Sequence, residues 1–442
     1  MDILKNRNFS IMFAGRILTN IGDSLYAVAA MWLVYDLGGS TLYTGLAGFL
    51  SIIPRIIQIF SGPLIDRIPI RSILVYTQLF QGLILLIVPV AYYFGFLTVG
   101  LVLTITPILS TCNMFVYPAQ MSALPKILDQ KSLTQGNSLF SIAYQGIDVA
   151  CNAISGVLIV AVGAVSLYFW NAIGFFIGAL LFAQIRLSSH QAQTRAANDK
   201  PPTSADPSTY EEPSFLKRYF SEMTEGIRLL VATPLSRLLF GIIMVNAAGG
   251  ATFTVLPAFS DSLGGAGIYG MLLMAQALGS LLGAIAAPYL KLERVTLGTL
   301  YSVSFMICGL AWSLSIFTPW LWLTIFVYGL AWFPGGVTNV MINTVIQKGV
   351  PSKNLGSVFA AASGMSGIAM PIGSLIGGAL GIWIGGSGVI LWCGIIIFLV
   401  SVYWRFDPVT RKLPASDQIN ESLFGFFREP DSVKSEVATD IH

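Results

Sequence analysis

Four ionisable side chains stand well inside long apolar stretches of this 442-residue chain: Arg16, Asp23, Arg55 and Asp148. A carboxylate in such a place can bind and release a proton, because desolvation favours its neutral form and a nearby cation favours its charged form. A guanidinium keeps its proton, so it can only balance charge or hold an anionic group. These four residues are the first candidates for chemistry, and the segments that carry them decide whether they can meet.

The composition indicates whether these residues are surrounded by water or by a membrane. The chain is 55% hydrophobic and 10% charged, with a mean hydropathy of +0.75, whereas soluble domains carry about 25% charged residues. This favours a membrane protein, and the net charge of +3 gives no sign of a nucleic-acid partner. The four cysteines are scattered singly and both histidines lie outside the apolar runs, so we expect no metal site and no imidazole proton chemistry inside the membrane.

Twelve apolar segments are long enough to cross the bilayer, which takes about 20 residues. They lie at roughly 9–34, 42–62, 72–94, 97–121, 133–162, 166–185, 238–260, 267–290, 295–317, 320–346, 355–384 and 386–404. All should be helices, since an open sheet leaves backbone groups unsatisfied in lipid. The predicted fold class is an all-α membrane protein with twelve transmembrane helices in two six-helix pseudo-repeats.

An internal repeat supports this division. YPAQMSALPKILDQKSLTQGNSLF connects the fourth and fifth spans, and VTNVMINTVIQKGVPSKNLGSVF connects the tenth and eleventh with a similar order of polar, proline, basic and glycine residues. Such a repeat indicates a secondary transporter with its site between the halves. We expect helical bundles at 1–186 and 236–406, a cytoplasmic linker with an amphipathic helix at 187–235, and a cytoplasmic tail at 407–442.

The basic residues predict the orientation. The loops near residues 36, 95, 163, 263, 318 and 385 contain no Lys or Arg, whereas the alternate loops and both ends are basic. Because cytoplasmic loops carry the excess of Lys and Arg, we expect a multi-pass protein of the cell (cytoplasmic) membrane with both termini in the cytoplasm.

The loop GPLIDRIPIR resembles the signature between the second and third spans of the major facilitator superfamily, and its matching residues are Gly62, Asp66, Arg67 and Arg71. NRNFSIMFAGRILTNIGDSLY, SALPKI, EGIRLLVATPLSRLLFG and GVPSKNLGSVF are similar to the drug:proton antiporter branch that includes macrolide efflux pumps and the enterobactin exporter. The resemblance implies a cytoplasmic gate in which the Asp66 carboxylate docks at the start of the eleventh span. Such docking is physically reasonable, since a helix N-terminus attracts negative charge.

Counting along the helices places Asp23 and Asp148 at a similar depth, each about 14 or 15 residues, or roughly 22 Å, from the cytoplasmic end of its span. Arg16 and Arg55 should lie nearer that end. We interpret Asp23 and Asp148 as candidates for proton coupling, and Arg16 and Arg55 as their charge partners or as anion-binding groups. The alternative is a static buried ion-pair network that fixes helix packing.

Polar and aromatic residues on spans that line the cavity of this superfamily are the candidate substrate contacts: Asn113, Tyr117, Gln120, Tyr144 and Gln145 in the first half, and Asn246, Gln276, Asn339 and Asn343 in the second. The alternative for each is an interhelical hydrogen bond. In addition, we expect Gly146 to let a neighbouring helix approach Asp148 closely, and FPGGVTN to loosen the tenth span.

These observations favour a secondary transporter that exports amphipathic, drug-like small molecules by alternating access, in exchange for protons. The alternatives are an exporter dedicated to one metabolite such as a siderophore, and a transport-inactive sensor or scaffold. An enzyme is not expected, since the chain contains no nucleophile motif or phosphate loop. No cofactor is expected beyond the proton gradient, and the expected partners are the small-molecule substrate and the lipid bilayer, with the protein a monomer.

Overall fold

The computed structural model describes residues 2–54, 68–185, 235–287, 289–290, 292–349, 355–415 and 417–418, and its regular secondary structure in these ranges is helical. The first half contains η1 (Asp2–Lys5), α1 (Arg7–Gly38), α2 (Thr41–Leu50), α4 (Ile70–Tyr93), α5 (Val99–Ile127), α6 (Gln130–Val162) and α7 (Ala164–Ala183). The second half contains α10 (Leu235–Leu263), α11 (Ala266–Ala286), η2 (Leu292–Arg294), α12 (Leu297–Ser315), α13 (Leu321–Leu330), α14 (Phe333–Gly349), α15 (Leu355–Phe406) and α16 (Pro408–Arg411).

The described residues contain 10 helices long and apolar enough to cross a membrane, and the apolar segment Thr41–Pro54 is a shorter one. The helix α15 consists of two spans joined at Gly385, whose φ of 71° interrupts the helix. The predicted eleventh and twelfth spans meet at this residue. The tenth span is α13 followed by α14. The predicted all-α fold of twelve spans is confirmed, while the linker and its amphipathic helix lie outside the described residues.

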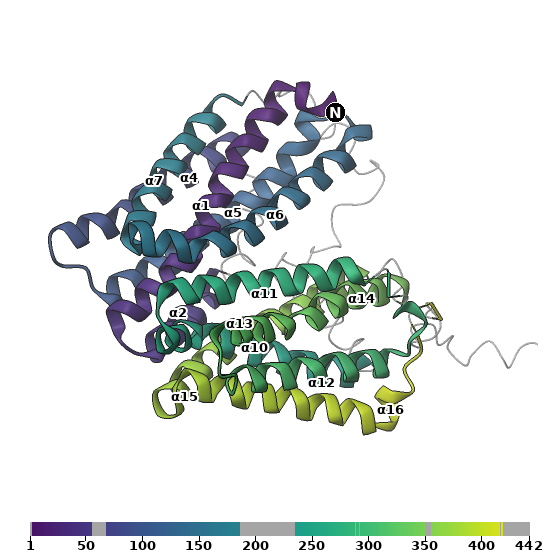
Figure 1. The fold of residues 1–442 in the computed structure, drawn as a ribbon. Coiled ribbons are helices and arrows are strands. Elements are labelled where there is room, and N and C mark those ends of the chain that lie inside the picture. The colour runs from purple at the N-terminus through teal and green to yellow at the C-terminus, as the bar shows by residue number, and fades with distance from the viewer. Residues whose placement is uncertain are drawn as a thin grey trace, which may run out of the picture.

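Local sequence explains where these helices begin and turn. Asn6, Ser40 and Thr98 each accept a hydrogen bond from a backbone N–H in the first turn of the helix that follows, which satisfies one of the unpaired donors of a helix start. Glycines in turns at one end of the bundle have a positive φ, which L side chains rarely adopt: Gly39, Gly95, Gly163, Gly264, Gly265 and Gly385. We call this the loop end, and the opposite end, where the N-terminus lies, the terminal end (Figure 1).

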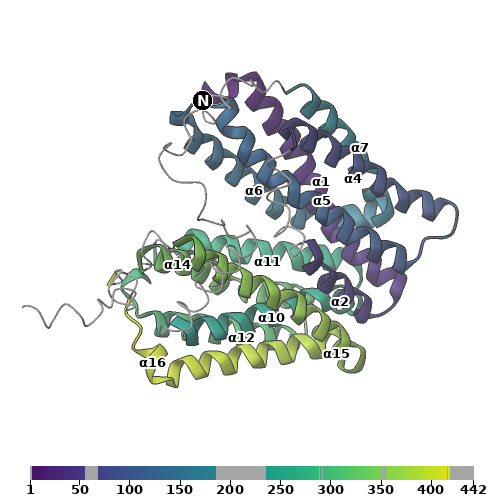
Figure 2. The ribbon, with the colours of Figure 1, turned by 180° about the vertical axis from the view of Figure 1, so that it is seen from behind.

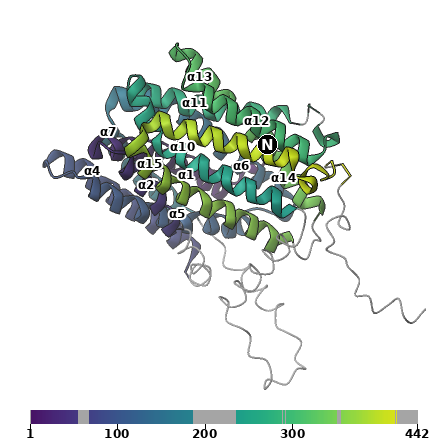
Figure 3. The same cartoon turned by 90° about the horizontal axis from the view of Figure 1, so that it is seen from below.

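The helices form two groups that pack against each other at the loop end (Figure 1). The helix α6 packs on α11, and α2 packs on α10 and α15, as Figure 3 also shows. Glycines allow this approach, because a Cβ built on Gly156 would lie 2.4 Å from the Cα of Gly270, and one on Gly45 would lie 2.9 Å from the Cα of Gly378. The backbones of the two halves therefore touch directly.

Hydrogen bonds between the halves also lie at the loop end. Thr41 Oγ1 donates to the carbonyl of Gly378 at 2.8 Å, and the Tyr35 hydroxyl donates to Asp261 Oδ2 at 3.2 Å. From there the two groups diverge toward the terminal end (Figure 2). The structure is thus closed between its halves at the loop end.

Large apolar side chains cover the periphery of the bundle. At the loop end Trp320, Trp322 and Trp383 are among the most exposed, with Trp383 at 86%. In water such a surface would be unstable, whereas tryptophan is favoured where hydrocarbon meets the lipid headgroups. The exterior is that of a multi-pass membrane protein.

Candidate functional site

The centre of the first half contains a buried arginine held by three polar side chains. Arg16 is only 4% exposed. Its Nε donates to Gln120 Oε1 at 2.9 Å and to the Tyr144 hydroxyl at 3.0 Å, and its Nη1 donates to Thr19 Oγ1 at 3.3 Å. The Tyr144 hydroxyl in turn donates to Gln120 Oε1. Three of the predicted site residues, from α1, α5 and α6, are therefore joined in one cluster.

The positive charge of this cluster has no carboxylate in direct contact among the described residues. The guanidinium is 5.5 Å from the centre of the Tyr144 ring, which gives a favourable cation–π contact. Neutral acceptors and an aromatic face hold the charge in place without neutralising it. An anionic group that came near would gain strongly from it, because few waters screen a buried charge.

The two predicted proton carriers lie together farther along α1. Ser24 Oγ donates to Asp148 Oδ1 at 2.6 Å, which places α6 beside α1 at this depth. Asp23, one residue earlier, is partly buried and lies close enough to Asn113, Arg16 and Asp148 to interact with them electrostatically. The prediction that Asp23 and Asp148 share one level is confirmed by this contact. The side chain of Asp148 is exposed at this level.

Other predicted site residues of the first half do not join this group in the same way. Tyr117 and Gln145 are exposed, although the Tyr117 hydroxyl interacts electrostatically with that of Tyr144. Arg71 donates to the carbonyl of Ala183 at the end of α7, a contact that ties α4 to α7. The predicted charge partner Arg55 and the remaining members of the predicted gate, Gly62, Asp66 and Arg67, lie outside the described residues.

The second half has a pocket of about 360 Å³ that the predicted residues Asn246 and Asn339 line. Its wall is largely apolar and includes the aromatic residues Phe305, Trp312 and Trp332. Asn246 Nδ2 donates to the carbonyl of Ile242 in its own helix, which leaves its oxygen as an acceptor. The described residues of its lining include no ionisable side chain except Tyr301 and Cys308, so the pocket suits an apolar or aromatic part of a ligand.

The other two predicted substrate contacts of the second half are Gln276 and Asn343. Gln276 does not line the pocket, and its Oε1 is buried without a hydrogen-bond partner among the described residues. Asn343 belongs to α14, but its side chain lies outside the described part of the chain. Only Asn246 and Asn339 are therefore brought together.

Two local expectations can be tested directly. The helix of the tenth span is interrupted at Ala331–Trp332, just before FPGGVTN, which was expected to loosen it. The expectation for Gly146 is wrong, because a Cβ at that position would meet nothing within 4 Å. The close approach on α6 occurs instead at Gly156, ten residues later.

Sequence reasoning missed three buried amide side chains of the first half. Gln78 and Gln81 on α4 are almost fully buried, and Asn171 on α7 donates to the carbonyl of Gly22 at 2.9 Å. The signal was present, since Gln78 and Gln81 are three residues apart and share one face of an apolar helix. The oxygens of all three side chains have no hydrogen-bond partner among the described residues.

The fold and these groups together define a class of protein. Two sets of membrane-spanning helices meet at one end, and charged and polar side chains lie about midway along them. This is the architecture of a secondary transporter. The chain belongs to the transmembrane secretion effector family of the major facilitator superfamily, whose family model matches residues 2–440. The predicted resemblance to this superfamily is confirmed.

Individual relatives are distant but similar over most of their length. The multidrug efflux pump Tap of Mycolicibacterium fortuitum is 23% identical over 414 residues, which cover 91% of this chain and 96% of the pump. The staphyloferrin A transporter of Staphylococcus aureus is 21% identical over 303 residues, 68% of this chain and 71% of that protein. Among solved structures, the nucleoside transporter NupG aligns with a TM-score of 0.63 at 12% identity, over 90% of this chain and 98% of NupG, which shows a shared fold.

Proposed function

We propose that this protein exports amphipathic small molecules across the cytoplasmic membrane by alternating access, in exchange for protons. In this proposal both termini and the terminal end face the cytoplasm, the chain works as a monomer in the bilayer, and the proton gradient takes the place of a cofactor. The two helical bundles at 1–186 and 236–406 rock about the loop-end contacts. The structure then corresponds to the state that is open to the cytoplasm.

The observation that carries the proposal is the group formed by Asp23, Asp148 and Arg16 midway along α1 and α6. In the cytoplasm-open state a carboxylate releases its proton, and the charge of Arg16 stabilises the resulting anion. The substrate then binds between the halves. In the opposite state the carboxylate takes up a proton as the substrate leaves. Proton import and substrate export are therefore coupled.

The composition of the second half supports an amphipathic substrate. Its aromatic pocket at Asn246 and Asn339 accepts an apolar moiety, while the charged group of the first half faces the polar part. The relative Tap, which is named a multidrug efflux pump, agrees with a substrate of this kind.

The test uses inverted membrane vesicles that hold a preformed pH gradient, with ethidium as the probe. We expect ethidium to dissipate the gradient in the unmodified protein, and Asp23→Asn or Asp148→Asn to reduce this by at least tenfold, because proton transfer by a positioned group contributes about 100-fold or more. Asp129→Asn is the matched control, since Asp129 precedes α6 and makes no capping hydrogen bond. Ethidium uptake with an unchanged gradient in all four proteins would refute proton coupling.

A second candidate is an exporter of one anionic metabolite such as a siderophore, favoured by the unneutralised charge of Arg16. The relative named staphyloferrin A transporter points the same way. Arg16→Gln would then abolish movement of a polycarboxylate while movement of ethidium persisted. If neither compound moves across the membrane in any variant, the protein is instead the transport-inactive sensor or scaffold.

A further inference from the structure

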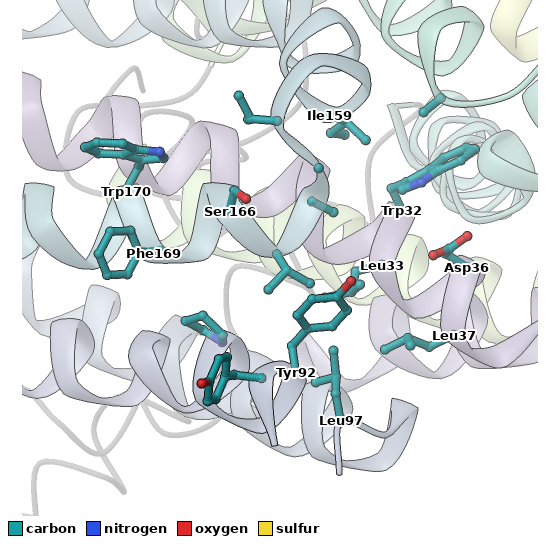
Figure 4. Close-up of a pocket in the computed structure, with 17 residues that line it drawn as sticks. Trp32, Leu33, Asp36, Leu37, Tyr92, Leu97, Ile159, Ser166, Phe169 and Trp170 are labelled. Atoms are coloured by element: carbon teal, nitrogen blue, oxygen red, sulfur yellow. The ribbon is translucent and has the colours of Figure 1, made fainter. Parts of the chain in front are cut away.

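A second cavity, of about 590 Å³, lies at the loop end of the first half. Its wall comes from the end of α1, the end of α4, the end of α6 and the start of α7, with Ala266 of α11 at the edge. Figure 4 shows Trp32 and Asp36 on one side, Phe169 and Trp170 on the other, and Tyr92 between them. Its volume is that of a site for a drug-sized ligand.

The cavity is negatively charged. Among the described residues of its lining, Asp36 is the one carboxylate, and none is Lys, Arg or His. The loops at this end of the molecule contain no basic residue either. No described group donates a hydrogen bond to the Asp36 carboxylate, so its charge is not neutralised by the described part of the protein.

The aromatic wall adds a second attraction of the same sign. The faces of Trp and Tyr rings attract cations, Trp most strongly. Trp32 lies on the same side of the cavity as Asp36, Tyr92 lies between the two sides, and Trp170 lies across from them (Figure 4). We propose that this cavity is a binding site for a lipophilic organic cation, an ammonium or phosphonium centre that carries aromatic or alkyl groups.

The site is separate from the group proposed for transport. Asp36 is thirteen residues after Asp23 on the same helix, which corresponds to about 20 Å along its axis. An interfacial belt of aromatic residues would account for Tyr92 and Trp170, which are exposed. It would not account for a hollow of about 590 Å³ beside a carboxylate that no basic side chain of the described lining accompanies.

A cationic group can reach this cavity from two sources: a free organic cation, or the ammonium headgroup of phosphatidylethanolamine. Ser166 lines the cavity and offers a local reporter (Figure 4). In the full-length protein with Ser166→Cys, the rate at which a membrane-impermeant thiol reagent modifies position 166 reports on occupancy. Phosphatidylglycerol vesicles provide a bilayer without an ammonium lipid.

We expect tetraphenylphosphonium to slow this modification in phosphatidylglycerol vesicles, while tetraphenylborate, of the same shape and opposite charge, does not. Asp36→Asn should weaken the protection by about fivefold or more, the loss expected for one exposed charge contact of roughly 1 kcal/mol. Asp36→Glu should restore it. Asp261→Asn is the matched control, because it removes a carboxylate at the same end outside the cavity and keeps an acceptor for Tyr35.

Slower modification in phosphatidylethanolamine vesicles without any probe, reversed by Asp36→Asn, would identify the lipid headgroup as the occupant. Equal protection by the two probes, or protection that Asp36→Asn leaves unchanged, would overturn the proposal and leave an apolar crevice. The proposal does not depend on proton coupling, since vesicles without a pH gradient suffice and the proposed transport can fail or succeed independently.

Discussion

Arg16 shows how a charge is kept inside an apolar bundle. Neutral oxygens from Thr19, Gln120 and Tyr144 accept from its Nε and Nη1, and no described carboxylate touches it. A permanent salt bridge would have neutralised the guanidinium and left it unavailable to another anion. Neutral partners leave it able to respond to an anion, whether a side chain or a substrate.

At the residue scale we predict that Tyr144→Phe destabilises the first half. The substitution removes a hydroxyl that accepts from Arg16 and donates to Gln120, and a buried group left unsatisfied costs about 1–3 kcal/mol. Thermal unfolding in detergent measures the loss. Tyr117→Phe is the control, because Tyr117 is 54% exposed. Equal melting temperatures for the two variants would contradict the assigned role of Tyr144.

At the element scale, Asp407 links helices at the terminal end of the second half. It follows α15, caps α16 by accepting from the N–H and the hydroxyl of Thr410, and pairs with Arg237 at the start of α10. Burial acts to raise the pKa of the Asp407 carboxyl, but the Thr410 hydrogen bonds and the Arg237 guanidinium outweigh it and hold the pKa below its ordinary value. One side chain thus joins three helices.

This predicts a dependence of stability on acid pH. A carboxyl whose pKa is lowered on folding stabilises the protein above its unfolded pKa, about 3.9, and this contribution is lost as the pH falls through the folded pKa. The melting temperature should fall as the pH is lowered from about 5 to about 3, and Asp407→Asn should flatten this part of the profile. A profile unchanged by the substitution would show that the carboxylate contributes nothing.

The glycines of α6 make a second prediction at this scale. Gly156→Val should force the halves apart at the loop end, because its Cβ would lie 2.4 Å from the Cα of Gly270. Spin labels at positions 37 and 383, in a cysteine-free background, should report a longer distance between the halves. Gly146→Val is the control, since a Cβ there meets nothing within 4 Å. A similar distance in both variants would exclude this contact as the point of closure.

At the scale of the whole molecule, charge is sorted between the two ends. Lys5, Lys126 and Arg411 lie at the terminal end, whereas the described charges of the loop end are Asp36 and Asp261. By the positive-inside rule, this distribution supports the proposed orientation, in which the terminal end faces the cytoplasm. We predict that green fluorescent protein fused after His442 fluoresces, and that alkaline phosphatase fused there is inactive. The reverse pair of results would invert the proposed orientation.

The sequence by itself determined the helices. A span of about 20 apolar residues has one stable backbone conformation in lipid, so length and hydropathy were enough to locate α1, α4 and α7 and even the break at Gly385. It also identified Arg16, Asp23 and Asp148, because a charge inside such a span stands out from its neighbours. The depth count that placed Asp23 and Asp148 at one level rested only on the fixed rise of a helix.

Only the tertiary structure decided which side chains meet. Gln120 and Tyr144 reach Arg16, but Gln276 does not reach Asn246, and Gly156 rather than Gly146 is the point of contact. These outcomes depend on how each helix is rotated about its axis, and apolar residues around a membrane helix barely restrict that rotation. The rotation is set by packing between helices far apart in the chain, which also created the cavity at Asp36.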